Sequence, residues 1–286
     1  MSSRRQRAAT DRGQQTLDEA IKSRLIHEPV VGAVPRVELP DVECEAFIET
    51  HHCSRSVLIS LDDARRAINR NEWSEVLTDY HIPITTATEK DGITTGRSMD
   101  EVLRILEVIQ PAIHVPDVSF AYGYMDDLTI AEVADAYVEY VVELSREIND
   151  RDYDIRLMPT QKGWTTDHFE PYRRLREDYG ITDYAFYCGQ SIGGHAGNAL
   201  HKDRREARTF ITTVDPENVM LIGRMSPDEL RQFEPRVTSA AGLNYWRTRC
   251  QTSSGYSYRQ YRELDAEIDQ ALKWNHEAKQ SNLRIY

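Results

Sequence analysis

The sequence has few lysines, few cysteines and no long hydrophobic stretch. Only six of its 286 residues are lysine, so most of the positive charge comes from arginine. No window approaches the ~18 consecutive apolar residues that predict a membrane-spanning helix. The four cysteines form no Cys-x-x-Cys pair, which indicates free thiols rather than a disulfide framework. The basic start MSSRRQR has no apolar stretch behind it, unlike a secretory signal. We therefore expect a cytoplasmic protein with no membrane partner.

The sequence is strongly acidic, and it lacks a standard metal-binding pattern. The formal net charge is −12, and a strongly acidic surface keeps a chain soluble in high salt. A GC-rich genome also favours arginine over lysine, so a halophilic origin is one of two interpretations. Cys44 and Cys53 flank His51 and His52, but this spacing fits no standard zinc pattern. We expect no metal and no cofactor.

Short β-branched runs alternate with amphipathic segments along most of the chain. This alternation predicts a parallel sheet covered by helices. Eight such units in this length match an α/β fold of the (β/α)₈ TIM-like barrel type. The predicted strands are Pro29–Val34, Ser56–Ser60, His81–Thr86, Ala112–Val115, Ile155–Pro159, Tyr184–Cys188, Val219–Gly223 and Val237–Leu243. The predicted helices are Val42–Thr50, Leu61–Asn69, Ser98–Ile109, Thr129–Asn149, Thr165–Tyr179, His201–Thr213, Pro227–Phe233 and Tyr258–Lys279.

The predicted organisation is a single domain with two appendages. Residues 1–28 form a flexible N-terminal arm, residues 29–246 the barrel, and residues 247–286 a C-terminal basic–aromatic segment and helix. A doubly wound open sheet is the alternative, although the glycine fingerprint expected after its first strand is missing. The run His81–Thr86 could also be one arm of a hairpin closing at Lys90-Asp-Gly92.

Polar residues that follow the predicted strands are candidates for an active site, because barrels gather their chemistry at the carboxyl ends of strands. Asp117 offers two acceptor oxygens to a flat polar ring such as the edge of guanine, or it is an ordinary turn acid. Gln161 suits recognition of a base, or it faces solvent in a loop. The segment Gly189–Gly194 could bring backbone amides close to a ligand. It also matches the G-x-S-x-G pattern of serine hydrolases, but no acid follows in the required order.

One segment departs from the acidic trend. Residues 235–262 contain no Asp or Glu, and five arginines alternate with aromatic residues there. Arginine binds phosphates and aromatic rings stack on unpaired bases, so this basic–aromatic strip is a candidate nucleic-acid surface. Alternatively, its arginines pair with acids elsewhere in the chain. The candidate contact residues are Tyr245, Trp246, Arg247, Arg249, Arg259 and Arg262.

The order of several motifs resembles the tRNA-guanine transglycosylase superfamily, some of whose members insert 7-deazaguanine bases into DNA. The resemblance spans roughly residues 56–246. It is carried by the segments KDGITTGRSMDEVLRI (90–105), HVPDV (114–118), TQKGW (160–164), YCGQSIGG (187–194) and NVMLIGRMSPDELRQF (218–233).

The resemblance implies roles for particular residues. Asp117 would bind the base, Gln161 would contact its edge, and Gly189, Gln190, Gly193 and Gly194 would form the loop supporting the pocket. The family's general acid/base lies in a glycine-rich loop, where this chain has Asp62 and Asp63 without glycines. The family's nucleophilic aspartate is replaced by the segment SAAGLNYW, where Asn244 is the nearest polar residue. The family's zinc motif is also missing.

These observations leave three hypotheses about function. The first is exchange of guanine for a 7-deazaguanine base in DNA or tRNA, with Asp62, Asp63 or Asp117 as catalytic carboxylates. The second is a catalytically inactive relative that binds nucleic acid or partners an active subunit, as a homodimer or in a heteromeric complex. The third is an unrelated barrel enzyme acting on a small phosphorylated metabolite, with Gly189–Gly194 as its anion site.

Overall fold

The computed structural model describes residues 28–39, 41–51, 54–70, 77, 80–88, 97–119, 125–188 and 199–283. One parallel sheet of eight strands forms its centre, and a two-stranded hairpin lies near the C-terminal end. The strands of the sheet are β1 (Gly32–Val37), β2 (Ser56–Ser60), β3 (Ile82–Thr86), β4 (Ile113–Val115), β5 (Arg156–Leu157), β6 (Asp183–Tyr187), β7 (Asn218–Ile222) and β8 (Val237–Gly242). The hairpin strands are β9 (Gln251–Thr252) and β10 (Gly255–Tyr256).

The eight parallel strands close into a barrel, as the alternation of strands and helices predicts. The order in the sheet is β5-β4-β3-β2-β1-β8-β7-β6. A single parallel bridge between Thr160 and Ala185 joins its two edges, and the Ala185 amide donates a hydrogen bond to the carbonyl of Pro159. The hairpin interpretation of His81–Thr86 is wrong, because β3 pairs in parallel with both β2 and β4.

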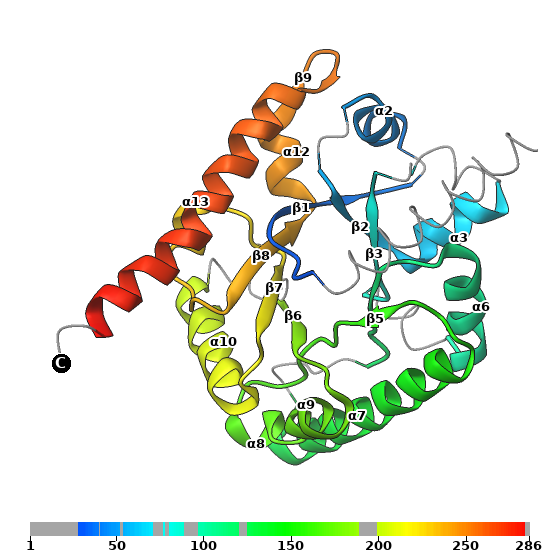
Figure 1. Cartoon of the computed structure of the whole chain (residues 1–286), viewed down its shortest axis with the longest axis vertical. Helices are drawn as coiled ribbons and strands as arrows, with labels where there is room; N and C mark the ends of the chain where they lie inside the picture. Colours follow the sequence, from blue (N-terminus) through cyan, green and yellow to red (C-terminus); the bar gives the residue numbers. More distant parts are fainter. Residues whose placement is uncertain are drawn as a thin grey trace, which may run out of the picture.

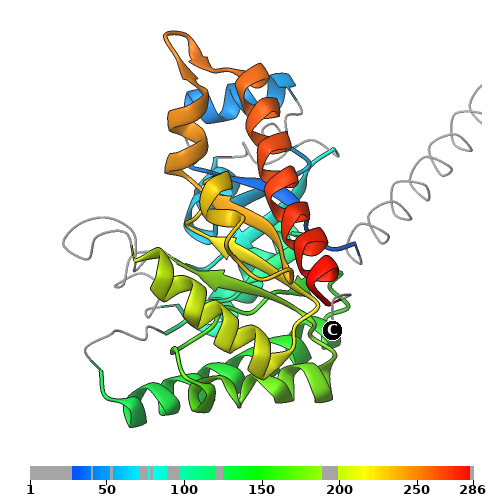
Figure 2. The same ribbon diagram turned by 90° about the vertical axis from the view of Figure 1, so that its left-hand side faces the viewer.

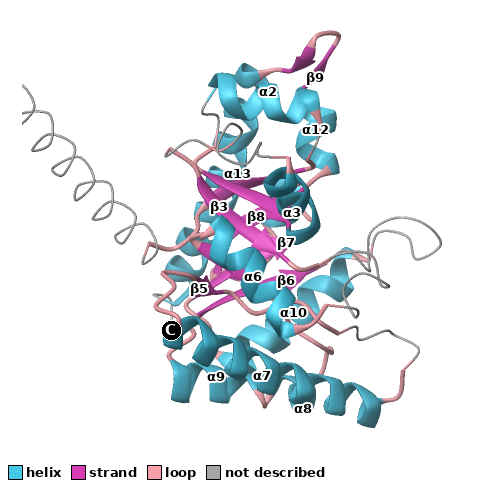
Figure 3. Ribbon diagram, turned by 90° about the vertical axis from the view of Figure 1, so that its right-hand side faces the viewer, coloured by secondary structure: helices cyan, strands magenta, loops and turns pink. Residues whose placement is uncertain are grey.

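Helices surround the barrel as a ring in Figure 1. They are α2 (Val42–His51), α3 (Leu61–Asn69), α6 (Met99–Ile109), α7 (Asp127–Asp150), α8 (Thr166–Phe169), α9 (Tyr172–Tyr179), α10 (Leu200–Val214), α11 (Pro227–Leu230), α12 (Asn244–Cys250) and α13 (Tyr258–Leu283). Figure 3 shows the strands as a central layer between helices. Of the helices in the described part of the chain, none is long and apolar enough to cross a membrane.

The predicted helix Thr165–Tyr179 is two helices in the structure. The first, α8, ends at Phe169, and the second, α9, begins at Tyr172. Pro171 lies between them as the residue that precedes α9. Proline has no N–H to donate, and its ring clashes with the carbonyl four residues earlier, so a continuous helix is broken there.

Strand alternation divides the core into two parts. Interior side chains such as Val34, Leu58 and Ile84 fill the barrel. Outward side chains such as Val57 and Ile59 pack against the helices in a larger cluster. Successive side chains of a strand point to opposite faces, so each short strand contributes to both clusters. This explains why the strands read as continuous apolar runs.

The C-terminal segment is packed directly against β1. Asp265 and Tyr261 of α13 both contact Ala33: the Asp265 carboxylate accepts a hydrogen bond from its amide at 3.2 Å, and the Tyr261 hydroxyl donates one to its carbonyl at 3.4 Å. The predicted boundary after residue 246 falls inside α12. In Figure 2, α12 and α13 lie side by side, joined by the β9–β10 hairpin. Residues 244–272 are thus part of the same packed unit as the barrel.

Replacing Phe210 with alanine tests the packing of helices on the barrel. Phe210 is fully buried on α10, with its ring centre 5.1 Å from that of Phe169 and 5.5 Å from that of Tyr184. Because a large cavity would remain, we expect Phe210→Ala to lower the free energy of unfolding by about 3–5 kcal/mol in urea titrations. The control Val108→Ala removes a side chain that is 58% exposed and should change it by less than about 0.5 kcal/mol. Equal losses in the two variants would contradict this packing.

Candidate functional site

The predicted catalytic and base-binding residues lie at the carboxyl edge of the barrel. Asp62 and Asp63 follow β2, Asp117 follows β4, and Gln161 follows β5. Barrels of this type place their active sites at this edge, because the loops after the strands meet around the mouth. The remaining predicted base-binding residues, Gly189, Gln190, Gly193 and Gly194, lie outside the described part of the chain.

Asp117 forms a buried ion pair with Lys162 across the ends of β4 and β5. The Lys162 ammonium donates a hydrogen bond to the Asp117 carboxylate, and each side chain is 7% exposed. The ammonium also lies 5.0 Å from the centre of the Tyr137 ring. A buried charge without a partner is strongly disfavoured. Here the attraction between the two charged groups, together with that between the ammonium and the ring, offsets the cost of removing both groups from water. A polar ligand reaching this pair would find both a carboxylate acceptor and an ammonium donor.

The Tyr137 hydroxyl connects the loops that carry this ion pair. It donates a hydrogen bond to the carbonyl of Pro116 at 2.8 Å and accepts one from the amide of Thr160 at 2.8 Å. The Tyr172 hydroxyl donates to the carbonyl of Thr160 at 3.2 Å. Burial raises the pKa of Tyr137 far above its usual value, so its hydroxyl stays protonated. These bonds hold the ends of β4 and β5 at a fixed separation.

Gly163 shapes the loop immediately after Lys162. Its φ of +90° lies in the left-handed region, and a Cβ at this position would stand 2.6 Å from the Cβ of His168. The amide of Trp164 donates a hydrogen bond to Nδ1 of His168 at 3.3 Å. Only glycine fits such a backbone conformation and such a close approach. Steric constraints therefore explain why the TQKGW segment has a glycine at position 163.

Asp62 and Asp63 lie in the first turn of α3 and pair with arginines. Asp62 contacts Arg65 at 2.8 Å, Arg66, and Arg97 at 3.3 Å. Asp63 contacts Arg66 at 3.2 Å. Burial alone would raise the pKa of Asp62, but the hydrogen bond and charge of Arg65 and the charge of Arg66 outweigh burial and lower it. Asp62 is therefore an ionised partner of arginines at neutral pH, a state poorly suited to donating a proton.

Arg97 also influences His114, which lies on the outward face of β4. Nδ1 of His114 is 2.9 Å from the Thr85 hydroxyl, and its side chain is fully buried. Burial and the charge of Arg97 lower the pKa of His114 to about 3. This ring is neutral at physiological pH. The acids after β2 thus belong to an ion-pair group with Arg97, whereas Asp117 belongs to a second group with Lys162.

Gln161 joins two strands in the structure. Its side-chain amide donates a hydrogen bond to the carbonyl of Tyr187 at 3.2 Å, and its carbonyl oxygen accepts one from the Tyr187 amide at 3.0 Å. The side chain thereby extends the contact between the ends of β5 and β6. Recognition of a base edge by Gln161 would require this two-point contact to open, so the predicted role stays a prediction.

The first part of the basic–aromatic strip is engaged within the protein. Trp246 is fully buried and donates a hydrogen bond to the carbonyl of Arg36 at 3.0 Å. Its ring is therefore not available for the predicted stacking on an unpaired base. Arg247 pairs with Glu38 at 2.8 Å and Asp41 at 2.7 Å. Tyr245 is half-buried against the hydrophobic core.

The remaining arginines of the strip also have partners. Arg249 pairs with Glu267 at 3.2 Å and Arg259 with Glu263 at 3.0 Å. Arg262 donates a hydrogen bond to the Tyr258 hydroxyl at 3.1 Å. All of these acids lie outside residues 235–262, so a window confined to that segment overestimates its positive charge. The alternative, in which the arginines pair with acids elsewhere in the chain, describes Arg247, Arg249 and Arg259.

The described cysteines are buried thiols. Cys44, Cys188 and Cys250 are free, and burial raises the pKa of Cys44 to about 12 and that of Cys250 to about 11. The thiolate is the reactive form, so these groups are poor nucleophiles. The described residues contain no group of three or more His, Cys, Asp or Glu side chains able to hold a metal ion. The side chains of His51, His52 and Cys53 lie outside the described part.

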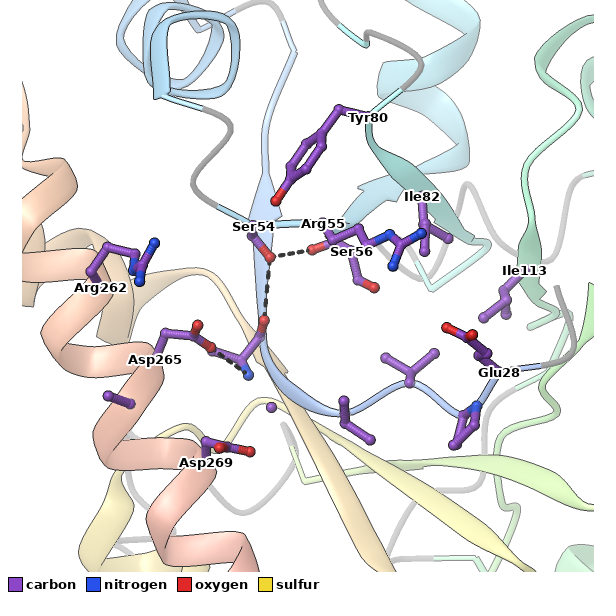
Figure 4. Close-up of a pocket in the computed structure, with 16 residues that line it drawn as sticks. Glu28, Ser54, Arg55, Ser56, Tyr80, Ile82, Ile113, Arg262, Asp265 and Asp269 are labelled. Carbon is purple, nitrogen blue, oxygen red and sulfur yellow. Dashed lines mark hydrogen bonds between the residues drawn. The ribbon is translucent and has the colours of Figure 1, made fainter. Parts of the chain in front are cut away.

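A cavity of about 490 Å³ lies at the opposite, amino end of the barrel. Figure 4 shows Asp265 and Asp269 of α13 on one side of it and Ser54 and Ser56, at the start of β2, on another. The Ser54 hydroxyl donates to the carbonyl of Ser56 at 2.8 Å. The polar groups here fix the start of β2 and the contact of α13 with β1, a structural role usual at the amino face of such barrels.

Two residues of the mouth carry no role in the sequence-based prediction. Lys162 stands in the quoted TQKGW segment, and only the structure shows that it pairs with Asp117. Arg36 follows the interior residue Val34 by two positions on β1, which extends through Val37 rather than ending at Val34. If the prediction had extended this strand past Val34, the alternation of its side chains would have indicated that Arg36 points into the barrel.

The lowered pKa of Asp62 predicts a specific pH dependence. A carboxylate whose pKa falls on folding stabilises the protein above its unfolded pKa of about 3.9, and this contribution is lost as the pH falls through the folded pKa. We expect Asp62→Asn to lower the free energy of unfolding by about 1–3 kcal/mol at pH 7, and the difference from the original protein to shrink below about pH 4. The control Asp100→Asn changes an exposed acid in the first turn of α6. A difference independent of pH would contradict the ion-pair account.

The partners of Arg249 and Arg259 predict a weak effect on nucleic-acid binding. Because Glu267 and Glu263 already balance these arginines, we expect the double variant Arg249→Ala/Arg259→Ala to bind duplex DNA and tRNA within about twofold of the original protein. The slope of log affinity against log salt concentration should stay unchanged. A large loss of affinity together with a shallower slope would show instead that the strip contacts phosphates.

No family model matches the chain. No curated protein matches it either. What is established is the eight-stranded parallel barrel, with its buried Asp117–Lys162 pair at the carboxyl edge.

Proposed function

We propose that this chain exchanges guanine for a 7-deazaguanine base in DNA or tRNA, at the carboxyl mouth of its barrel. The observation that carries the proposal is the buried Asp117–Lys162 pair at the ends of β4 and β5. Asp117 is also the residue for which the resemblance to the transglycosylases implies base binding. The reaction class follows from that resemblance, and the ion pair supplies a physical means of performing it.

The pair offers complementary groups to a guanine ring. The Asp117 carboxylate can accept two hydrogen bonds, and guanine presents two adjacent donors, N1–H and the 2-amino group. These donors would replace Lys162 on the carboxylate. The freed ammonium would then stand beside a base that acquires negative charge as its glycosidic bond breaks. A preorganised cation in a site that excludes water stabilises such charge strongly.

The carboxylate that attacks the sugar is assigned by comparing the two remaining acids. Asp62 contacts three arginines and its pKa is lowered, which weakens it as a nucleophile. Asp63 contacts Arg66 at 3.2 Å, and its side chain, 11% exposed, is more accessible than that of Asp62, 6% exposed. Asn244, the nearest polar residue to the family's nucleophile position, is exposed at the start of α12 and is an amide. Asp63 is therefore our candidate for the covalent step.

The experiment is an exchange assay with labelled guanine. The purified protein is incubated in high salt with duplex DNA or tRNA, and label retained in the polymer is counted. We expect Asp117→Asn to reduce exchange by about 10²–10³-fold, because it removes the carboxylate charge that orients both the guanine ring and the Lys162 ammonium. Asp135→Asn, which changes an exposed acid on α7, should leave exchange unchanged.

Asp63→Asn separates the two proposed roles. If Asp63 attacks the sugar, this variant still binds guanine but retains no label, whereas Asp117→Asn loses guanine binding itself. Absence of exchange in the folded original protein would contradict the proposal. If that protein still bound guanine and polymer, the inactive-relative hypothesis would replace it.

A second candidate function is a barrel enzyme acting on a small phosphorylated metabolite. The observation favouring it is that the arginines of residues 235–262 are engaged within the protein, four of them with acids. A protein that binds a polymer needs an extended basic surface, whereas a small metabolite needs only the barrel mouth. Absence of both exchange and salt-dependent polymer binding would favour this candidate.

A further inference from the structure

One arginine of the barrel stands apart from the ion pairs described above. Arg36 on β1 is paired in register with Leu58 of β2, an interior residue, and alternates with the interior residue Val34. Its side chain therefore points into the barrel. Arg36 is the next-to-last residue of β1, so it enters the interior near the carboxyl mouth.

The guanidinium of Arg36 has no partner in the described structure. Its Nε is buried without a hydrogen bond, and no carboxylate of the described residues forms an ion pair with it. Every other fully or partly buried arginine of the described segments has a polar partner. These pairs are Arg97–Asp62, Arg156–Asp183, Arg174–Glu139, Arg176–Asp215, Arg204–Gln232, Arg224–Asp203 and Arg247–Glu38.

This contrast is physically informative because the chain is rich in acids. A partly buried cation without a counter-ion loses hydration that nothing replaces, and 47 Asp and Glu residues are present to supply a counter-ion. A guanidinium kept unpaired in a barrel mouth is explained by an anion that arrives from outside. Arginine holds such a group through parallel hydrogen bonds from its planar fork.

Other unused donors lie at the same end of the barrel. The Thr88 hydroxyl, just after β3, and the Ser119 hydroxyl, after β4, are buried without a hydrogen-bond partner. In closed barrels, interior side chains of alternate strands share a layer, so β3 contributes to the same layers as β1, and Thr88 continues the interior side of β3 four positions after Ile84. A tetrahedral oxyanion accepts hydrogen bonds in several directions, and a site offering a guanidinium and hydroxyls suits it.

The geometry points to a phosphate-binding site on Arg36 in the barrel mouth. It is distinct from the Asp117–Lys162 pair, whose charges already compensate each other. The site itself does not depend on the proposed base exchange, since the second candidate function would use it too. Identifying the phosphate as part of a guanine nucleotide does rest on the proposed function.

The first test uses inorganic phosphate with Arg36→Met, which keeps the length of the side chain and removes its charge. Calorimetric titration should show that this variant binds phosphate at least about tenfold more weakly than the original protein. Arg36→Lys keeps the charge and should restore part of the affinity. Arg104→Met removes an exposed charge on α6 and should bind phosphate like the original protein.

Thermal unfolding distinguishes a binding role from a structural one. Without phosphate, Arg36→Met should unfold at the same temperature as the original protein or higher, because an uncompensated cation has been removed. With phosphate, the unfolding temperature of the original protein should rise and that of Arg36→Met should not. Equal phosphate affinity in both proteins, or a clear destabilisation of Arg36→Met without phosphate, would overturn the proposal.

Three further ligands identify the source of the phosphate. If it belongs to a nucleotide, GMP should bind the original protein at least about tenfold more tightly than guanosine, and Arg36→Met should abolish this difference. Guanosine binding should then depend on Asp117 and not on Arg36. Tighter binding of glycerol phosphate than of GMP would assign the site to a small metabolite and would count against base exchange while leaving the phosphate site intact.

Discussion

The hydroxyl of Tyr137 is the contact on which the geometry of the mouth depends. It links the carbonyl of Pro116 to the amide of Thr160, the residues just before Asp117 and just before Gln161. β4 and β5 are very short, so the hydrogen bonds between these two strands do little to fix the loops that follow them. A hydroxyl from the surrounding helix α7 supplies the missing connection, and a ring from the same residue attracts the Lys162 ammonium.

Arginine pairing organises much of the rest of the molecule. The acids of this chain accumulate a net charge of −12, and in the described segments arginines join elements that are distant in sequence. Arg224 connects the end of β7 to Asp203 of α10, and Arg247 connects α12 to Glu38 after β1. The planar guanidinium contacts two acids at once more readily than a lysine ammonium, which gives the arginine-rich composition a structural use.

Much of the fold was predictable because strand–helix alternation is a local signal. All eight predicted strands appear in the structure, seven of them with shifted ends. β1 extends to Val37 because its ladders with β8 and β2, rather than its own composition, determine where it ends. Thr165–Tyr179 was predicted as one helix because hydrophobic spacing outweighed Pro171, although the proline carried the correct signal.

The site was less predictable because its contacts are long-range. The strand-end position of Asp117 followed from the sequence, but its partner Lys162 is 45 residues away. The charge of Arg247 is balanced by Glu38 and Asp41, which lie more than 200 residues earlier. A local window cannot detect such partners. The absence of a partner for Arg36 is equally invisible until every neighbouring element is in place.

The contact that closes the barrel between β5 and β6 is shorter than the contacts between its other neighbouring strands. Elsewhere in the barrel, neighbouring strands share a ladder of two or more paired positions, whereas these edges share one bridge, with the Gln161 side chain beside it. This join is therefore a seam that divides the chain into a piece carrying β1 to β5 and a piece carrying β6 to β8. If the chain were cut in the turn between α9 and β6, the pieces would reassemble along the long ladder between β1 and β8, and the short seam would close last.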